Sequence, residues 1–411
     1  MIALPGSHGA LDSGSAAGKG RERFTAFLSD AQSEQTVQQC VTDMALSFSS
    51  VHSGGILRAN AHLEKSRSPM ALMVDISNTE LPVNEVHRLA EVCEPGVSVV
   101  VVGDRNDVGL YRDLIRAGVS DYIVKPLTRS LVQSAIDTAL GLGTANTEAT
   151  PLNQKSGRIV TVIGARGGVG ATTVASNLAW FLANKESRRV CLVDLDVHYG
   201  DCALTLDIKL DGSAGLREAL ESPTRIDDLF LDRAMVRSGD RLFLLSSEEK
   251  LESPLRLDPE ALAPLFDVLR RQFHYVIVDV PRENGTFLHQ MMELATTRIV
   301  VLDQTARAIR DVLRLRSIID APHAGQRNLV VLNRMGESGK SDIDLATLSS
   351  TIGMPVDTTI AYHPKSVIAA GNAGRPIAGE KGPIAGAIAN IASELSGRHV
   401  TQRRPFWSRF K

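Results

Sequence analysis

A glycine-rich turn between a predicted strand and a predicted helix limits the fold of this chain more than any other feature. Residues Arg158–Ile163 form an apolar run typical of a buried strand, and residues from Thr173 onward carry apolar side chains at helical spacing. Gly164–Thr173 connects the two. Glycines let several backbone N–H groups face one anion, and the helix N-terminus adds a partial positive charge. This order predicts an α/β domain whose loop binds phosphate.

The predicted phosphate loop lacks a lysine at its usual place. The standard pattern puts Lys at position 171, where this chain has Ala171, so no cation points from there at the β and γ phosphates. Arg166, near the start of the loop, could supply another cation, and the Thr172 hydroxyl could reach a magnesium ion. A glycine turn that binds nothing is the alternative interpretation. The candidate nucleotide-binding residues are Gly167, Gly168, Val169, Gly170, Ala171, Thr172 and Thr173.

Length and charge restrict the class of protein. A chain of 411 residues predicts two or three domains, and a net charge of −2 argues against binding to nucleic acid. The four cysteines are scattered without a C-x-x-C pair, which argues against a zinc site or a disulfide framework. Apolar runs stay well below the roughly 20 residues needed to cross a bilayer. We therefore expect a cytoplasmic protein.

The chain is predicted to hold two doubly wound, parallel-sheet domains of the α/β class. We expect a disordered lead at 1–21, a first domain at 22–142, a linker at 143–157, a second domain at 158–397 and a basic aromatic tail at 398–411. Short apolar runs alternate with helical patterns in both domains, as parallel sheets covered by helices require. Strands are predicted at Phe24–Leu28, Ser47–His52, Ala71–Val74, Ser98–Val102 and Asp121–Val124, and then at Arg158–Ile163, Val190–Val193, Leu242–Leu245, Val276–Val278, Arg298–Leu302 and Leu329–Leu332.

The segment Arg166–Thr173 resembles the deviant phosphate loop of the MinD/ParA ATPase family. In that family the first Lys of the loop reaches across a dimer interface to the nucleotide of the partner. Arg166 occupies that position here, and a guanidinium binds phosphate with a geometry different from that of an ammonium. The resemblance implies ATP and Mg²⁺ as ligands and a nucleotide-bridged homodimer, while Ala171 predicts weak hydrolysis or none.

Three further segments resemble the same family in the same order. Asp194 and Asp196 end a predicted strand, and the resemblance implies that Asp196 positions the attacking water. Asp279 ends a run like the Walker B strand, and Asn333 matches the residue that contacts adenine. Two carboxylates near a phosphate loop suit hydrated magnesium, although each could be an ordinary strand-end residue. The implied metal-binding residues are Thr172, Asp194 and Asp279, and the implied catalytic residues are Asp196 and Arg166.

The first domain resembles the receiver domain of two-component signalling. Asp75 ends a predicted strand at the place of the phosphorylated aspartate, Asp30 follows the first strand, and Lys125 stands in a run ending Lys-Pro. The pattern departs from receivers in having one acid after the first strand and Gly103 where a hydroxyl residue is expected. We therefore expect a receiver-shaped docking module rather than a domain phosphorylated at Asp75.

A receiver-like domain followed by a MinD/ParA-like domain resembles the CpaE/TadZ pilus assembly proteins, as does the run Asp194–Asp201. The resemblance implies a localisation factor for a tight-adherence (Flp-type) pilus secretion machine at the cell pole, with components of that machine as partners. An active positioning ATPase and a DNA-partition ATPase are the alternatives. The basic and aromatic residues at 403–411 suit an anionic membrane surface, with a plain frayed tail as the other interpretation.

Overall fold

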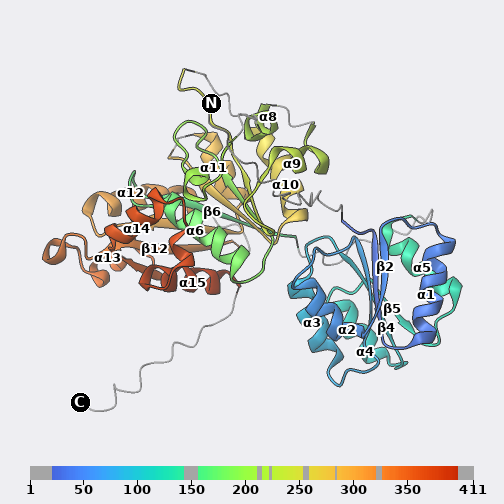
Figure 1. Cartoon of the computed structure of the whole chain (residues 1–411). Coiled ribbons are helices and arrows are strands. Elements are labelled where there is room, and N and C mark those ends of the chain that lie inside the picture. Colours follow the sequence, from blue (N-terminus) through green and yellow to red (C-terminus); the bar gives the residue numbers. More distant parts are fainter. Residues whose placement is uncertain are drawn as a thin grey trace, which may run out of the picture. The chain divides into compact units, whose positions relative to one another are not determined.

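The chain divides into two compact units, Met1–Cys93 with Val97–Asn153 and Glu94–Gly96 with Gln154–Lys411. The computed structural model in Figure 1 describes residues 21–142, 156–210, 215–221, 225–252, 259–282, 285–320 and 326–396. The predicted lead as far as residue 20, residues 143–155 of the predicted linker and the predicted tail at 398–411 lie outside the described residues.

The first unit is a parallel sheet of five strands in the order β2-β1-β3-β4-β5. Helices cover both faces (Figure 1), and each face has its own apolar core. One core lies under α1 and α5, and the other under α2, α3 and α4. The elements are β1 (Phe24–Leu28), α1 (Ala31–Asp43), β2 (Ser49–Ser53), α2 (Gly55–Leu63), β3 (Ala71–Asp75), α3 (Pro82–Val92), β4 (Ser98–Gly103), α4 (Val108–Arg116), β5 (Asp121–Val124) and α5 (Arg129–Leu140).

The second unit is built on an eight-stranded sheet in the order β13-β12-β11-β6-β10-β7-β9-β8. Its neighbouring strands run parallel except for the antiparallel pair of β8 and β9. The interior strands are buried on both sides, as strands between two helix layers must be. The strands are β6 (Arg158–Gly164), β7 (Val190–Asp194), β8 (Val236–Arg237), β9 (Leu242–Leu245), β10 (Tyr275–Val280), β11 (Thr297–Leu302), β12 (Arg327–Met335) and β13 (Thr358–Ala361).

Two layers of helices pack on this second sheet. One layer contains α6, α7, α14 and α15, and the other contains α8 to α13 (Figure 1). The helices are α6 (Ala171–Asn184), α7 (Cys202–Thr205), α8 (Gly215–Glu221), α9 (Asp228–Ala234), α10 (Leu262–Gln272), α11 (Thr286–Leu294), α12 (Ala306–Ile319), α13 (Leu345–Ile352), α14 (Pro364–Asn372) and α15 (Pro383–Ser396), with short 3₁₀ turns at Pro259–Ala261, Gly339–Ser341 and Ile377–Gly379. In the described part of the chain, no helix is long and apolar enough to cross a membrane.

The predicted α/β class with parallel sheets is confirmed. Two strands of the second unit, β8 and β13, were not predicted, since both are short and lie at the sheet edges, where the apolar pattern is weak. The predicted strand at Ser47–His52 lies at Ser49–Ser53 instead. Because β6, β7, β10, β11 and β12 are parallel, the residues that follow them share one edge of the sheet, where ligands of open α/β sheets bind.

Candidate functional site

The phosphate loop joins β6 to α6 as the sequence predicts. Gly168 and Gly170 have φ angles of +75° and +89°, a backbone region that side chains rarely adopt. A Cβ on Gly164 would lie 2.8 Å from Val169 Cγ2, so the chain passes close to itself at the loop entrance. Helix α6 begins at Ala171, directly after Gly170. Its first-turn N–H groups have no partner within the helix and form a binding position for an anion.

Ala171 is the first residue of α6 and packs against the apolar core beneath that helix. Its methyl group carries no charge and reaches no further than Cβ. A phosphate bound at this loop would therefore be stabilised by backbone dipoles and by side chains elsewhere, not by a lysine at this position.

The guanidinium of Arg166 is held within its own chain. It donates to the carbonyl oxygen of Gly167 at 3.1 Å and pairs with the carboxylate of Asp303. Asp303 follows β11, is 2% exposed, and accepts a second hydrogen bond from the Thr305 hydroxyl at 2.6 Å. No pattern in the sequence pointed to Asp303. In this arrangement Asp303 neutralises the guanidinium of Arg166.

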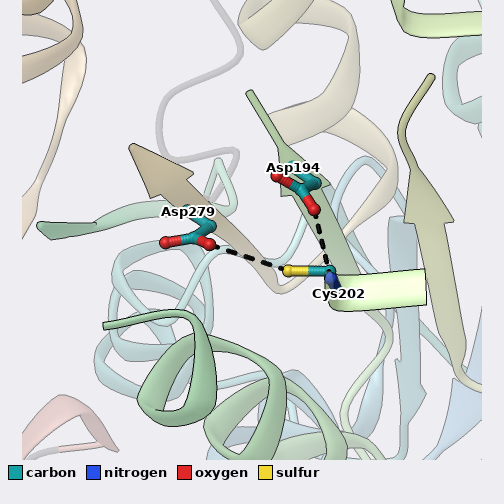
Figure 2. A group of neighbouring side chains, drawn as sticks. All are labelled: Asp194, Cys202 and Asp279. Atoms are coloured by element: carbon teal, nitrogen blue, oxygen red, sulfur yellow. Dashed lines mark hydrogen bonds between the residues drawn. The ribbon is translucent and has the colours of Figure 1, made fainter. Parts of the chain in front are cut away.

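Asp194 and Asp279 lie side by side because β7 and β10 are neighbours with these two residues in register. Figure 2 shows that Cys202, the first residue of α7, completes the group. Its backbone N–H donates to Asp194 Oδ2 at 3.2 Å, and its thiol donates to Asp279 Oδ2 at 3.8 Å. Interaction with the Thr172 hydroxyl lowers the pKa of Asp279 and so opposes the effect of burial. Three of the predicted metal-site residues are thus brought together, and Cys202 is an addition.

Burial gives this acidic pair unusual proton affinity. It raises the pKa of Asp194 to about 6, and burial together with the charge of Asp194 raises the pKa of Asp279 to about 7. Burial also raises the pKa of the Cys202 thiol well above its usual range. Within the described residues, neither carboxylate forms an ion pair with a Lys, Arg or His. The hard oxygens of Thr172, Asp194 and Asp279 fit a magnesium ion, which would supply the missing positive charge.

Asp196 lies in a loop that turns back on β7. Its carboxylate accepts from the backbone N–H groups of Tyr199 at 2.9 Å and His198 at 3.4 Å. Gly200 is required here, since a Cβ would lie 2.4 Å from Asp194 Oδ2 and 2.3 Å from the carbonyl oxygen of Asp196. The same turn that fixes Asp196 therefore brings Cys202 next to Asp194.

A pocket of about 260 Å³ adjoins the phosphate loop on the side of β12 and β13. Gly168, Gly170 and Thr173 contribute to it, together with Asn333, whose side-chain amide donates to the Val169 carbonyl oxygen at 2.7 Å. Its apolar wall comes from α6, β13, α14 and α15. The sequence pointed to Asn333 but not to that wall, which consists of Val174, Ile360, Val367, Ile368, Ile384 and Ile388.

Arg334, next to Asn333, also lines the pocket. Its Nη1 donates to the carbonyl oxygen of Gly168 at 2.9 Å, and its guanidinium carbon lies 5.4 Å from the ring centroid of Tyr362. Its φ of +58° is uncommon for a residue with a side chain and aims it at the phosphate loop. The pocket combines an apolar wall with polar groups beside the phosphate loop, a combination that suits a heterocyclic base.

The first unit brings its three predicted residues together. Lys125 Nζ lies 2.6 Å from Asp30 Oδ2 and 2.6 Å from Asp75 Oδ2. The Asp75 carboxylate also accepts from the backbone N–H groups of Ser29 and Ser77, each at 2.9 Å. Burial alone would raise the pKa of Asp75, but these bonds, that of Lys125 above all, hold its pKa below the usual range. Asp30 in addition caps α1 by accepting from Ser33 N.

Gly103 has a physical reason in the structure. A Cβ at this position would lie 2.4 Å from the hydroxyl oxygen of Tyr122 and 2.9 Å from its ring. The Tyr122 hydroxyl in turn donates to the Arg105 carbonyl oxygen at 2.8 Å. The space where receivers carry a hydroxyl side chain is therefore filled by a buried aromatic ring.

Comparison with known proteins finds relatives of the second unit. Residues 157–329 match the family model described as an AAA domain. The septum site-determining protein MinD of Bacillus subtilis (strain 168) is 26% identical over 260 residues, which cover 59% of this chain and 91% of that protein. The structure of MinD complexed with Mg-ADP from Pyrococcus horikoshii has the same fold, with a TM-score of 0.51 and 22% identity over 58% of this chain and 95% of that one. The second unit thus resembles MinD in sequence and the MinD and ParA ATPases in fold.

A pilus assembly protein CpaE from Caulobacter crescentus is 31% identical over a shorter stretch, 29% of this chain and 95% of that one. The TM-score of this match is 0.27, so it supports no conclusion about fold or function.

Proposed function

We propose that this protein is an ATP-binding localisation and assembly factor that acts as a dimeric scaffold, with weak hydrolysis or none. One observation carries the proposal. The phosphate loop, the acidic pair and the base pocket are all assembled at one sheet edge, but Ala171 stands where the catalytic cation of the loop would be. The site is built to be occupied by nucleotide, and it lacks a main device for rapid turnover.

The proposed placement of the nucleotide follows from the geometry. The base enters the pocket beside Asn333, and the phosphates lie against the loop and the N-terminus of α6. Thr172, Asp194 and Asp279 hold the magnesium ion that accompanies the phosphates. Magnesium would neutralise charge on the phosphates and on the acidic pair. The Mg-ADP found in the Pyrococcus horikoshii relative is a ligand of this class.

Arg166 gives the proposed dimer its link to the nucleotide. A second copy of the chain brings another γ-phosphate near Arg166, and the guanidinium then exchanges Asp303 for phosphate oxygens. The ion pair with Asp303 holds Arg166 back until that phosphate is present. Nucleotide thus favours the dimer to the extent that Arg166 binds the phosphate oxygens more strongly than it binds Asp303.

The pilus role depends on the sequence resemblance. The order of a receiver-like unit before a MinD/ParA-like domain, and the run Asp194–Asp201, favour an assembly factor for a Flp-type (tight-adherence) pilus secretion system. In this proposal the first unit docks onto pilus machinery components near the cell pole. The second unit reports whether nucleotide is bound.

The decisive experiment measures the mass of the protein in solution with Mg-ATP, Mg-ADP and no nucleotide, alongside phosphate release. We expect a dimer with Mg-ATP, a monomer otherwise, and phosphate release close to background. Asp303→Asn should strengthen dimerisation, because Arg166 loses its internal partner, and Arg166→Ala should abolish it. Rapid phosphate release that Asp196→Ala abolishes would instead establish the active ATPase. A chain that binds no ATP would refute the nucleotide-responsive scaffold.

A further inference from the structure

Three different metal-binding groups meet at the end of β7 and β10. The Asp194 and Asp279 carboxylates and the Cys202 thiol each offer one ligand atom, and these atoms all lie within 4.8 Å of one another. Figure 2 shows the Cys202 sulfur pointing toward the Asp279 carboxylate, with the Asp194 carboxylate next to the Cys202 backbone. All three side chains are buried, with exposures of 1%, 7% and 0%. They come from three separate elements, two strands and the start of α7.

The charges around this group call for a cation. In the described part of the chain, no basic side chain pairs with Asp194 or Asp279, and the further charged groups that act on Asp279 are Asp196 and Asp201, both acidic. Buried charges in proteins are paired or coordinate a metal.

The thiol does not suit magnesium. Magnesium takes oxygen ligands in octahedral geometry and has little affinity for sulfur. Cations of the zinc class bind carboxylate and thiolate together, usually as a tetrahedron. Bond lengths of about 2.3 Å to sulfur and 2.0 Å to oxygen put tetrahedral S and O ligands roughly 3.5 Å apart. Cys202 Sγ lies 3.8 Å from Asp279 Oδ2, so small side-chain rotations would close the site.

We propose that Asp194, Cys202 and Asp279 form a binding site for a thiophilic divalent cation of the zinc class. As the metal–sulfur bond forms, the S–H bond breaks and its proton leaves to solvent. The Ser176 hydroxyl, which donates to Cys202 Sγ at 3.4 Å, stabilises the resulting thiolate. The three protein ligands leave a fourth position open for water or a phosphate oxygen.

This site would compete with magnesium, because both cations use Asp194 and Asp279. A bound zinc-class cation therefore excludes the proposed Mg²⁺ arrangement and couples nucleotide occupancy to metal supply. The inference shares two residues with the proposed function, but it does not require nucleotide binding. Scattered cysteines argued against zinc at the level of sequence. In the folded chain, however, the turn at Gly200 places Cys202 next to the carboxylates of Asp194 and Asp279.

Cobalt(II) is the probe for the test, since it replaces zinc and has an absorption spectrum. The full-length chain, freed of metal by a chelator, is titrated with Co²⁺ in the absence of nucleotide. We expect one bound Co²⁺ per chain, a thiolate-to-cobalt charge-transfer band in the near ultraviolet, and loss of both spectrum and Co²⁺ on adding Zn²⁺. Cys202→Ser should abolish the band and weaken binding by more than the about 10–100-fold seen on loss of outer partners. Cys191→Ser, at a buried cysteine of β7, the strand that carries Asp194, should keep both.

Two results would overturn this inference. One is the absence of a charge-transfer band in the unaltered chain, a measurement that does not depend on whether a variant folds. The other is an unchanged band in Cys202→Ser. ATP binding is measured separately on the same protein. A chain that shows the cobalt band but binds no ATP would reject the proposed function alone. A chain that binds ATP but shows no cobalt band would reject the metal site alone.

Discussion

At the scale of single residues, Ala171 distinguishes this site from a complete phosphate loop. A lysine at the first position of α6 would extend along the phosphates, and a charged hydrogen bond contributes about 1.5–3 kcal/mol. Ala171→Lys should therefore tighten ATP binding by roughly tenfold or more and raise phosphate release above that of the unaltered chain. Ala171→Met, a side chain of similar reach without charge, is the control. Equal ATP affinities in calorimetric titrations of the two variants would contradict this account of the loop.

The acidic pair makes a prediction about pH. The pKa values of Asp194 and Asp279 in the folded chain, about 6 and about 7, lie above the ordinary aspartate value of 3.8. The folded state therefore holds protons that the unfolded chain releases between about pH 4 and 7, and the free energy of unfolding falls as pH rises through this window. Above about pH 7 this loss is complete.

Asp279→Asn tests this dependence by removing one charge while keeping the shape of the side chain. Without added metal, the variant should be more stable than the unaltered chain at pH 7.5 or so, by on the order of a few kcal/mol, and the advantage should shrink toward about pH 4. Thermal unfolding of both proteins across this range gives the comparison. Two curves that stay parallel at all pH values would show that the pair does not destabilise the folded chain.

At the scale of elements, the sequence predicted what depends on regular structure. The strand before the phosphate loop and the helix after it lie at Arg158–Gly164 and Ala171–Asn184, close to the predicted ranges. Asp194 and Asp279 end parallel strands, and the sheet alone brings such residues to one edge. A periodic pattern carries this information because it repeats over many residues.

Contacts made by loops and edges could not be predicted in the same way. Cys202 reaches Asp194 through the turn at Gly200. The chain can follow this path because Gly200 has no Cβ, which would clash with the Asp196 carbonyl oxygen and the Asp194 carboxylate. No sequence pattern marked Asp303 as the partner of Arg166, because that contact arises only when β11 lies beside β6 in the sheet. The pocket wall formed by α14 and α15 consists of residues distant in sequence from the phosphate loop. Each of these features depends on tertiary neighbours rather than on local pattern.

The receiver-like unit makes a prediction at this scale. The Asp75 side chain is fully buried, pairs with Lys125 and accepts hydrogen bonds from two backbone N–H groups. Tyr122 fills the space over Gly103. A phosphoryl donor would have to displace these contacts. We expect no shifted band on Phos-tag gels after treatment with acetyl phosphate, with an active receiver treated alongside. A shifted band that disappears in Asp75→Ala would show that the unit is a phosphorylated switch.

At the scale of the whole molecule, the two units treat similar acidic pairs differently. In the first unit, Lys125 lies between Asp30 and Asp75 and neutralises them from within the chain. In the second, Asp194 and Asp279 have no basic partner among the described residues, so bound protons or an external cation balance their charge. The first unit therefore needs no external cation to balance these two acids, which is consistent with the proposed docking module. In the proposed function, the second unit changes its charge when nucleotide and magnesium bind.

The C-terminal tail, which lies outside the described residues, tests where such a molecule acts. Residues 398–411 hold five Arg and Lys side chains together with Phe406, Trp407 and Phe410, in a chain whose net charge is −2. Each basic residue near an anionic membrane contributes about 1 kcal/mol, and aromatic rings favour the interface. We expect the full chain to co-sediment with anionic vesicles several-fold more than with neutral ones, and added salt should weaken this binding.

The matched control is a chain that ends at residue 397, which should lose this preference for anionic vesicles. A second control, Trp407→Ala with Phe406→Ala, separates the aromatic contribution from charge. If only charge matters, the double variant should bind as the full chain does. Equal sedimentation of the full and shortened chains would remove the membrane from the proposal. Any polar position would then have to come from protein contacts, and the receiver-like unit would be the first surface to test for them.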